Sequence, residues 1–178
     1  MRYLIAIAQD RFENGRTDSV LLEFHEVCDQ PPGTVVVSEA VAIDFDADGK
    51  VDFQKGDVNH NGKENSIDHR LLAIFANSYM KMNWTNTGVR RNRYMKIFSE
   101  DFHGDGSPNV VKLQLYTCRP DGTEEKLVSW HGMFDSNNDG TLDCIVNADA
   151  NHDGLIEHID SVIVQSLANV FQMFKWKG

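Results

Sequence analysis

Two stretches of the sequence place oxygen-bearing side chains at near-alternate positions around a single glycine. They read GDVNHNGKENSID (56–68) and ADANHDGLIEHID (148–160). A hard cation such as Ca²⁺ takes about six to eight oxygen ligands, and a twelve-residue loop supplies them from positions 1, 3, 5, 7, 9 and 12. Glycine at position 6 permits the sharp turn that this wrapping requires. The spacing therefore predicts two calcium-binding loops, 57–68 and 149–160; the alternative is a pair of solvated polar turns.

The same six positions carry the expected ligands in both loops, with the backbone carbonyl serving at position 7. The residues are Asp57, Asn59, Asn61, Lys63, Asn65 and Asp68 in the first loop and Asp149, Asn151, Asp153, Leu155, Glu157 and Asp160 in the second. Asp68 and Asp160 also stand where a helix is expected to begin, so each carboxylate would favour the positive end of a helix dipole. Beside them, Ile67 and Ile159 are expected to point toward the core.

A second pair of acidic loops lies just upstream, DFDADGKVD (44–52) and DSNNDGTLD (135–143). The candidate ligands are Asp44, Asp46, Asp48, the Lys50 carbonyl and Asp52, and Asp135, Asn137, Asp139, the Thr141 carbonyl and Asp143. Extended to twelve positions, these loops run over 44–55 and 135–146, and position 12 is Lys55 or Val146. Neither side chain can ligate a cation, so each site must borrow an oxygen from elsewhere or bind weakly. An acidic turn without an ion is the alternative.

A third pair, DRFENGRTD (10–18) and DFHGDGSPN (101–109), fits the pattern poorly. Phe12 has no ligand atom, and His103 suits a hard ion badly. The sequence favours strand-connecting turns at these two places.

The segments 57–80 and 149–172 resemble dockerin segments, the calcium loop-plus-helix form of the EF-hand. The resemblance implies calcium ligation at the positions given above, no entering helix, pairing about a pseudo-two-fold axis, and helices that bind a cohesin partner. Two features depart from the family: Glu64 stands where Ile156 and the family have an apolar residue, and residues 81–148 replace a short connection. Calcium ligation therefore carries over well, and cohesin binding carries over poorly. Loops 44–52 and 135–143 resemble the calcium repeats of thrombospondin type 3 and FG-GAP/VCBS proteins.

The whole chain reads as a duplication. RYLIAIAQDRFENGRTDSVLLEF (2–24) aligns with RYMKIFSEDFHGDGSPNVVKLQL (93–115), the acidic loops align in order, and Trp84 corresponds to Trp176. The sequence therefore predicts an α+β fold of two tandem homologous repeats, 1–87 and 88–178, co-packed in one domain with pseudo-two-fold symmetry. Each repeat is expected to contain about three strands, two acidic calcium loops and one helix.

Alternating and β-branched residues predict strands at about 3–8, 19–25 and 34–43, and at 94–98, 110–116 and 126–134. Apolar residues at helical spacing predict helices at about 68–82 and 160–175. The stripes that should face the core are Leu71, Leu72, Phe75, Tyr79 and Met82, and Ile163, Val164, Leu167, Phe171 and Phe174. Residues 83–92 are the best candidate for a linker between the repeats.

Composition restricts the function. The net charge of −10 argues against nucleic acid as a partner. No apolar stretch approaches the roughly 20 residues of a membrane span. Cys28, Cys118 and Cys144 lack zinc-site spacing. Their disulfide state is open, and buried free thiols are the simplest interpretation. His60 and His152, at the fourth position of matched loops, are expected to face solvent.

No hydrolase, nucleotide-binding or zinc-protease motif occurs in the sequence. The prediction is a non-enzymatic protein with Ca²⁺ at two sites and up to four, stabilising a module that binds another protein. Asn-rich ligand sets closed by Asp indicate modest affinity, suited to the cell surface, the extracellular space or the periplasm. An intracellular calcium buffer or sensor is the alternative, and a hydrolase with structural calcium is a further one.

Overall fold

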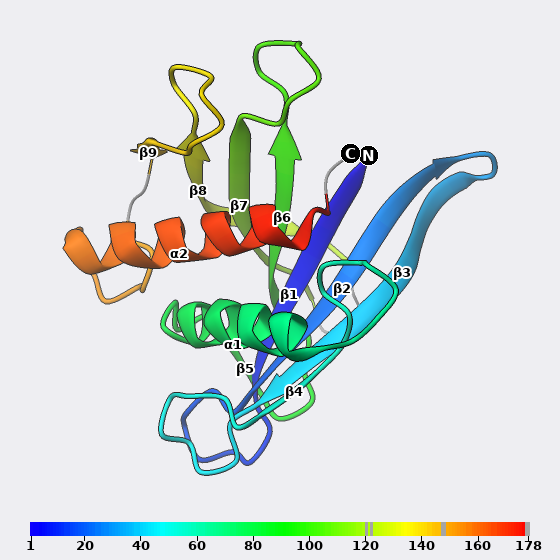
Figure 1. Ribbon diagram of the computed structural model, residues 1–178. Coiled ribbons are helices and arrows are strands. Elements are labelled where there is room, and N and C mark those ends of the chain that lie inside the picture. The colour runs from blue at the N-terminus through cyan, green and yellow to red at the C-terminus, as the bar shows by residue number, and fades with distance from the viewer. Residues whose placement is uncertain (120, 122, 147–148, 177–178) are drawn as a thin grey trace.

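The computed structural model describes residues 1–119, 121, 123–146 and 149–176. The described chain forms nine strands and two helices (Figure 1). Their bounds are β1 Arg2–Asp10, β2 Ser19–Asp29, β3 Pro32–Ile43, β4 Phe53–Lys55, α1 Ser66–Met80, β5 Thr85–Thr87, β6 Arg93–Glu100, β7 Val110–Thr117, β8 Lys126–Phe134, β9 Cys144–Val146 and α2 His158–Phe174.

All nine strands belong to one sheet, whose main path runs β4-β3-β2-β1-β6-β7-β8-β9. Neighbours on this path are antiparallel, while β5 pairs parallel with the end of β1. The two halves of the chain meet at β1 and β6, where Leu4 lies opposite Ile97 and Ala6 opposite Met95. Strands from both halves therefore share one hydrogen-bonded sheet.

Alternation along the strands gives the sheet one strongly apolar face. Leu4 and Ala6 of β1 and Leu22 and Phe24 of β2 are fully buried on that face. Successive side chains of a strand point to opposite sides, so the residues two positions apart stay in phase. This face carries the core, which contains buried residues from both halves of the chain.

The two helices cover that face and lie side by side in opposite directions (Figure 1). The hydroxyls of Ser78 and Ser166 are 2.7 Å apart across the pair, and the rings of Phe75 and Phe174 are 5.5 Å apart. Tyr79 reaches from α1 to the sheet and donates its hydroxyl to the Ala6 carbonyl at 2.9 Å. Neither helix of the described chain is long and apolar enough to cross a membrane.

The predicted helical stripes are confirmed. All ten residues named for the core are buried. The α+β class is also confirmed, and the sheet dominates it. The three longer strands of each half lie where they were predicted. β8 has the predicted bounds, and the other five extend beyond theirs by one to several residues.

The strand count was too low. Residues 1–87 contain five strands, and the described part of residues 88–178 contains four. The missing elements β4, β5 and β9 are three residues long, too short to show a period in sequence. β4 and β9 form because the preceding loop returns beside its strand: the Asp52 amide donates to Ile43 and the Asp143 amide to Phe134.

The predicted linker 83–92 contains a short strand, β5, which the sequence analysis did not predict. Asn86 fixes this strand. Its amide nitrogen donates to the carbonyls of Ala8 at 3.0 Å and Arg93 at 2.7 Å, and its oxygen accepts from the Arg93 amide.

The helices begin two residues earlier than predicted, at Ser66 and His158. The prediction that Ile67 and Ile159 face the core was wrong, since they are 60% and 37% exposed. In their place Asp68 and Asp160 turn inward and are fully buried. The reason is local: each carboxylate accepts backbone N–H groups from its own loop, which draws that side of the first turn inward.

Candidate metal centre

All six acidic loops share one backbone pattern. A residue with positive φ occupies the fourth position in each: Glu13, Ala47, His60, Gly104, Asn138 and His152. Glycine with φ between 83° and 91° occupies the sixth: Gly15, Gly49, Gly62, Gly106, Gly140 and Gly154. Non-glycine residues rarely adopt positive φ, so its recurrence at one loop position marks a common conformation.

The first residue of every loop is an aspartate that accepts the N–H of the sixth-position glycine. The N···O distances are 2.8 Å for Asp10, 2.8 Å for Asp44, 2.7 Å for Asp57, 2.7 Å for Asp101, 2.6 Å for Asp135 and 2.8 Å for Asp149. These bonds curl the chain around the carboxylate and fold all six loops in the same way.

Loop 57–68 follows the predicted ligand positions. The Asn61 amide donates to Asp57 and Asn59, and the Lys63 amide donates to the Asn61 side chain. These bonds tie the side-chain oxygens of positions 1, 3 and 5 to backbone N–H groups of the same loop.

The end of this loop also caps α1. Asn65 accepts from the Ile67 amide at 2.8 Å, and Asp68 accepts from the amides of Asn59 at 3.2 Å and Asn65 at 3.0 Å. The Asn65 side chain donates to the Lys63 carbonyl at 3.0 Å. Asn65, Asp68 and the Lys63 carbonyl thus have structural partners in addition to their predicted role as ligands.

Loop 149–160 repeats this arrangement. The Asp153 amide donates to both Asp149 and Asn151, and the Leu155 amide donates to Asp153 at 2.8 Å. Burial acts to raise the pKa of Asp160, but the backbone N–H groups of Glu157, Asn151 and Ala150 hold it below its usual value. The carboxylate therefore stays ionised at neutral pH.

Each of these two loops docks on a tryptophan of the other half of the chain. The His60 ring lies 4.4 Å from Trp176, and the His152 ring is stacked 5.0 Å from Trp84. His152 also contacts the Met82 carbonyl through Nδ1, at 3.1 Å. The prediction that both histidines face solvent was wrong for His60, which is half-buried against Trp176 and Phe24. Burial lowers the pKa of His60, an effect that Asp57 partly offsets.

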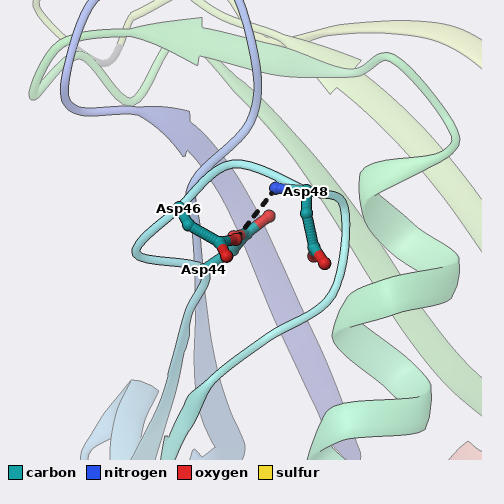
Figure 2. Close-up of side chains that lie close together, drawn as sticks. All are labelled: Asp44, Asp46 and Asp48. Atoms are coloured by element: carbon teal, nitrogen blue, oxygen red, sulfur yellow. Dashed lines mark hydrogen bonds between the residues drawn. The ribbon is translucent and has the colours of Figure 1, made fainter.

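Loop 44–52 brings three carboxylates together. One oxygen from each of Asp44, Asp46 and Asp48 lies within 4.8 Å of the other two (Figure 2). Asp44 is fully buried, while the other two are exposed. The Asp48 amide donates to Asp46, the Lys50 amide donates to Asp48, and the Phe45 amide donates to Asp52. We call Asp44, Asp46 and Asp48 the aspartate triad.

Loop 135–143 has the same backbone conformation as loop 44–52, but Asn137 stands at the position of Asp46. Asp135 accepts from the amides of Asp139 and Gly140, so both of its oxygens have partners. Thr141 donates its amide to Asp139. Hydrogen bonds from the amide and hydroxyl of Ser136 lower the pKa of Asp143.

Among the residues that the structure describes, the aspartate triad is the one group of three acidic, His or Cys side chains that converges this closely. The four acidic side chains of loop 149–160 and the three of loop 135–143 do not meet that distance. The predicted ligand sets of these two loops also include asparagine side-chain oxygens and backbone carbonyl oxygens.

Loops 10–18 and 101–109, which the sequence analysis interpreted as strand-connecting turns, pack against loops 44–52 and 135–143. Arg16 donates to the Ala47 carbonyl at 3.0 Å, and Asn138 donates to Asp105 at 2.5 Å. Figure 1 shows one such pair of loops at each end of the sheet. Asp18, the last residue of loop 10–18, is completely buried.

Sequence reasoning gave Asp18 no role, although a signal was present. Asp18 is in phase with Val20 and Leu22 of β2, which predicts that it faces the core side of the sheet.

No family model, curated protein or solved structure matches this chain.

Proposed function

We propose that this chain is a non-enzymatic calcium-binding protein, in which Ca²⁺ stabilises a structural or protein-binding module. The aspartate triad is the observation that carries the proposal. Three like charges so close repel one another, and a divalent cation removes that repulsion. The oxygens come from one loop of defined conformation, and Asp44 is buried, so the cluster is held in place by the fold.

Loops 57–68, 149–160 and 135–143 are the further calcium sites of the proposal. Their support is the backbone that they share with loop 44–52 and the side-chain oxygens at positions 1, 3 and 5, which accept N–H groups of their own loop. The four loops hold 14 of the 27 acidic residues, and four Ca²⁺ would change the formal charge of −10 to about −2.

We also propose that the chain is a duplicated unit with pseudo-two-fold symmetry, the axis passing between β1 and β6. The strand order reads the same outward from this pair in both directions, as β1-β2-β3-β4 and β6-β7-β8-β9. The β-bulges recur at Phe24/His25 and Leu115/Tyr116, which are 91 positions apart in the alignment. Residues 1–87 and 88–178 are the two repeats, packed as one domain through the shared sheet.

A sensor function receives less support than a structural one. A calcium sensor needs an apolar helix face that can be uncovered. Here the stripes of both helices pack on the sheet and on each other, with Leu72, Phe75 and Leu167 fully buried. Uncovering them would open the main core.

The proposed partner is another protein, met at the cell surface, in the extracellular space or in the periplasm. Exposed apolar side chains on two strands support this choice: Val35, Val36 and Val37 on β3, and Val128 and Trp130 on β8. Among the described residues Cys28, Cys118 and Cys144 are free thiols, but Cys144 is exposed and the other two are only partly buried, so the expectation that they are buried was wrong. Burial raises the pKa of Cys118, the opposite of what a catalytic thiolate requires.

The test is the metal content of the purified protein together with thermal unfolding in excess Ca²⁺ and in EGTA. Each site at 100 times its Kd contributes about 2.7 kcal/mol of folding free energy. The midpoint should therefore be markedly higher in Ca²⁺. Asp44→Asn should reduce that difference, whereas Asp29→Asn, outside every loop, should leave it unchanged. Identical unfolding in both buffers with no bound metal would refute the proposed function.

A further inference from the structure

Loop 44–52 lacks a ligand at position 12, and the structure places a candidate beside it. Asp18 and Asp44 lie opposite one another at the ends of β2 and β3, where the Asp44 amide donates to the Asp18 carbonyl at 2.8 Å. Residues that face each other across antiparallel strands project on the same side of the sheet. That side is the core face, since Val20 and Ala42, two positions inward, are both fully buried.

Both carboxylates are fully buried, and each is only half satisfied. Asp18 accepts from the Phe12 amide through Oδ2 at 2.8 Å, and Asp44 accepts from the Gly49 amide through Oδ2 at 2.8 Å. The Oδ1 atom of each is buried and has no hydrogen-bond partner. A buried charge without a partner is strongly unfavourable, so two such carboxylates on neighbouring strand ends favour the binding of a cation between them.

No protein cation fills this role in the described chain. The ion pairs found there do not include Asp18 or Asp44. Of the two arginines in loop 10–18, Arg16 donates its guanidinium to the Ala47 carbonyl at 3.0 Å, and Arg11 forms none of these ion pairs.

The other half of the chain shows the same place without the extra charge. Asn109 aligns with Asp18 and is also buried. Its oxygen accepts from the Phe102 amide at 2.7 Å, and its nitrogen donates to Asn138 at 3.4 Å. Beside it, both oxygens of Asp135 accept backbone N–H groups. The amide at this position thus has hydrogen-bond partners for both its oxygen and its nitrogen, whereas Oδ1 of Asp18 has none.

We propose that Asp18 is a ligand of the cation bound by the aspartate triad, so that loops 10–18 and 44–52 together form one divalent-cation site. The inference rests on the proposed function and adds a ligand from a loop that the sequence assigned to a plain turn. Asp18 lies outside the group of oxygens within 4.8 Å of one another, so the cation draws Asp18 toward the triad when it binds. The site in loop 135–143, with Asn109 in this place, binds more weakly.

The test compares Asp18→Asn with the wild type in EGTA and in excess Ca²⁺. In EGTA the variant should melt higher, by roughly 2–4 °C, because the amide keeps the bond from Phe12 and can donate to Asp44. Ca²⁺ should raise the midpoint of the variant by less than it raises the midpoint of the wild type. Calorimetric titration of the variant with Ca²⁺ should show one site weakened by about tenfold, because a charged ligand is lost. Asp29→Asn is the charge-matched control and should change neither quantity.

The outcomes separate the two proposals. A wild type that gains no stability from Ca²⁺ refutes the proposed function and the shared site with it. If Ca²⁺ stabilises the wild type, two results for Asp18→Asn would refute the shared site alone. The variant would lose stability equally in both buffers, or it would bind Ca²⁺ in the titration as the wild type does.

Discussion

Replacing Gly56 by alanine should destabilise the protein strongly and disturb the start of loop 57–68. Gly56 has φ of +134° and precedes Asp57 directly. A Cβ atom at this position would lie 2.5 Å from the Cβ and 2.9 Å from the Cα of Ala40, and 3.1 Å from the Glu39 carbonyl oxygen. The neighbour is therefore the backbone of β3, which cannot turn aside as a long side chain can.

Two effects add in this variant. Holding alanine at an unfavourable positive φ costs about 1–3 kcal/mol. Forcing an extra carbon into a packed site costs about 1–3 kcal/mol more. Ala40 is 3% exposed in a strand paired on both sides, so little relaxation is available. The expected loss is about 2–6 kcal/mol, a large part of the stability of an ordinary domain.

Urea unfolding followed by circular dichroism measures this loss, and Gly62→Ala is the matched control. Gly62 has φ of +83°, and an added Cβ would have no atom within 4 Å. That variant carries backbone strain alone, about 1–2 kcal/mol. If Gly56→Ala costs no more than Gly62→Ala, the close approach of loop 57–68 to β3 is refuted.

Three further predictions follow from individual side chains. Tyr79→Phe removes the buried bond to Ala6 and should cost about 1–2 kcal/mol in urea unfolding; no loss would contradict that bond. Burial lowers the pKa of His131 to about 4, so as pH falls from about 6.5 to 4 the unfolded chain gains a proton that the folded chain refuses. Up to about 3 kcal/mol of stability should be lost over this pH window in EGTA, and the His131→Gln variant should lose less. An NMR titration midpoint of His131 near 6.5 in the folded protein would refute the lowered pKa. Calcium should change tryptophan fluorescence, because Trp84 and Trp176 contact loops 149–160 and 57–68. Trp84→Phe and Trp176→Phe should each remove part of this change, and an unaltered response in both variants would contradict the docking.

The sequence by itself determined the local features of this protein. Loop geometry depends on residues a few positions apart, so the spacing of Asp, Asn and Gly predicted four of the loops that share one backbone conformation. Alternation along β1 and β2 and the stripe from Leu71 to Met82 depend on equally short intervals. The proposed duplication was predicted for the same reason, because aligning residue types in order needs no knowledge of contacts.

Tertiary structure alone decided which of these features meet. Asp18 and Asp44 are 26 positions apart, and only the pairing of β2 with β3 places them opposite one another. His60 reaches Trp176 only because the two helices run in opposite directions across one sheet. Periodicity describes a single segment, whereas burial and ligand geometry depend on distances between segments that the chain brings together only on folding.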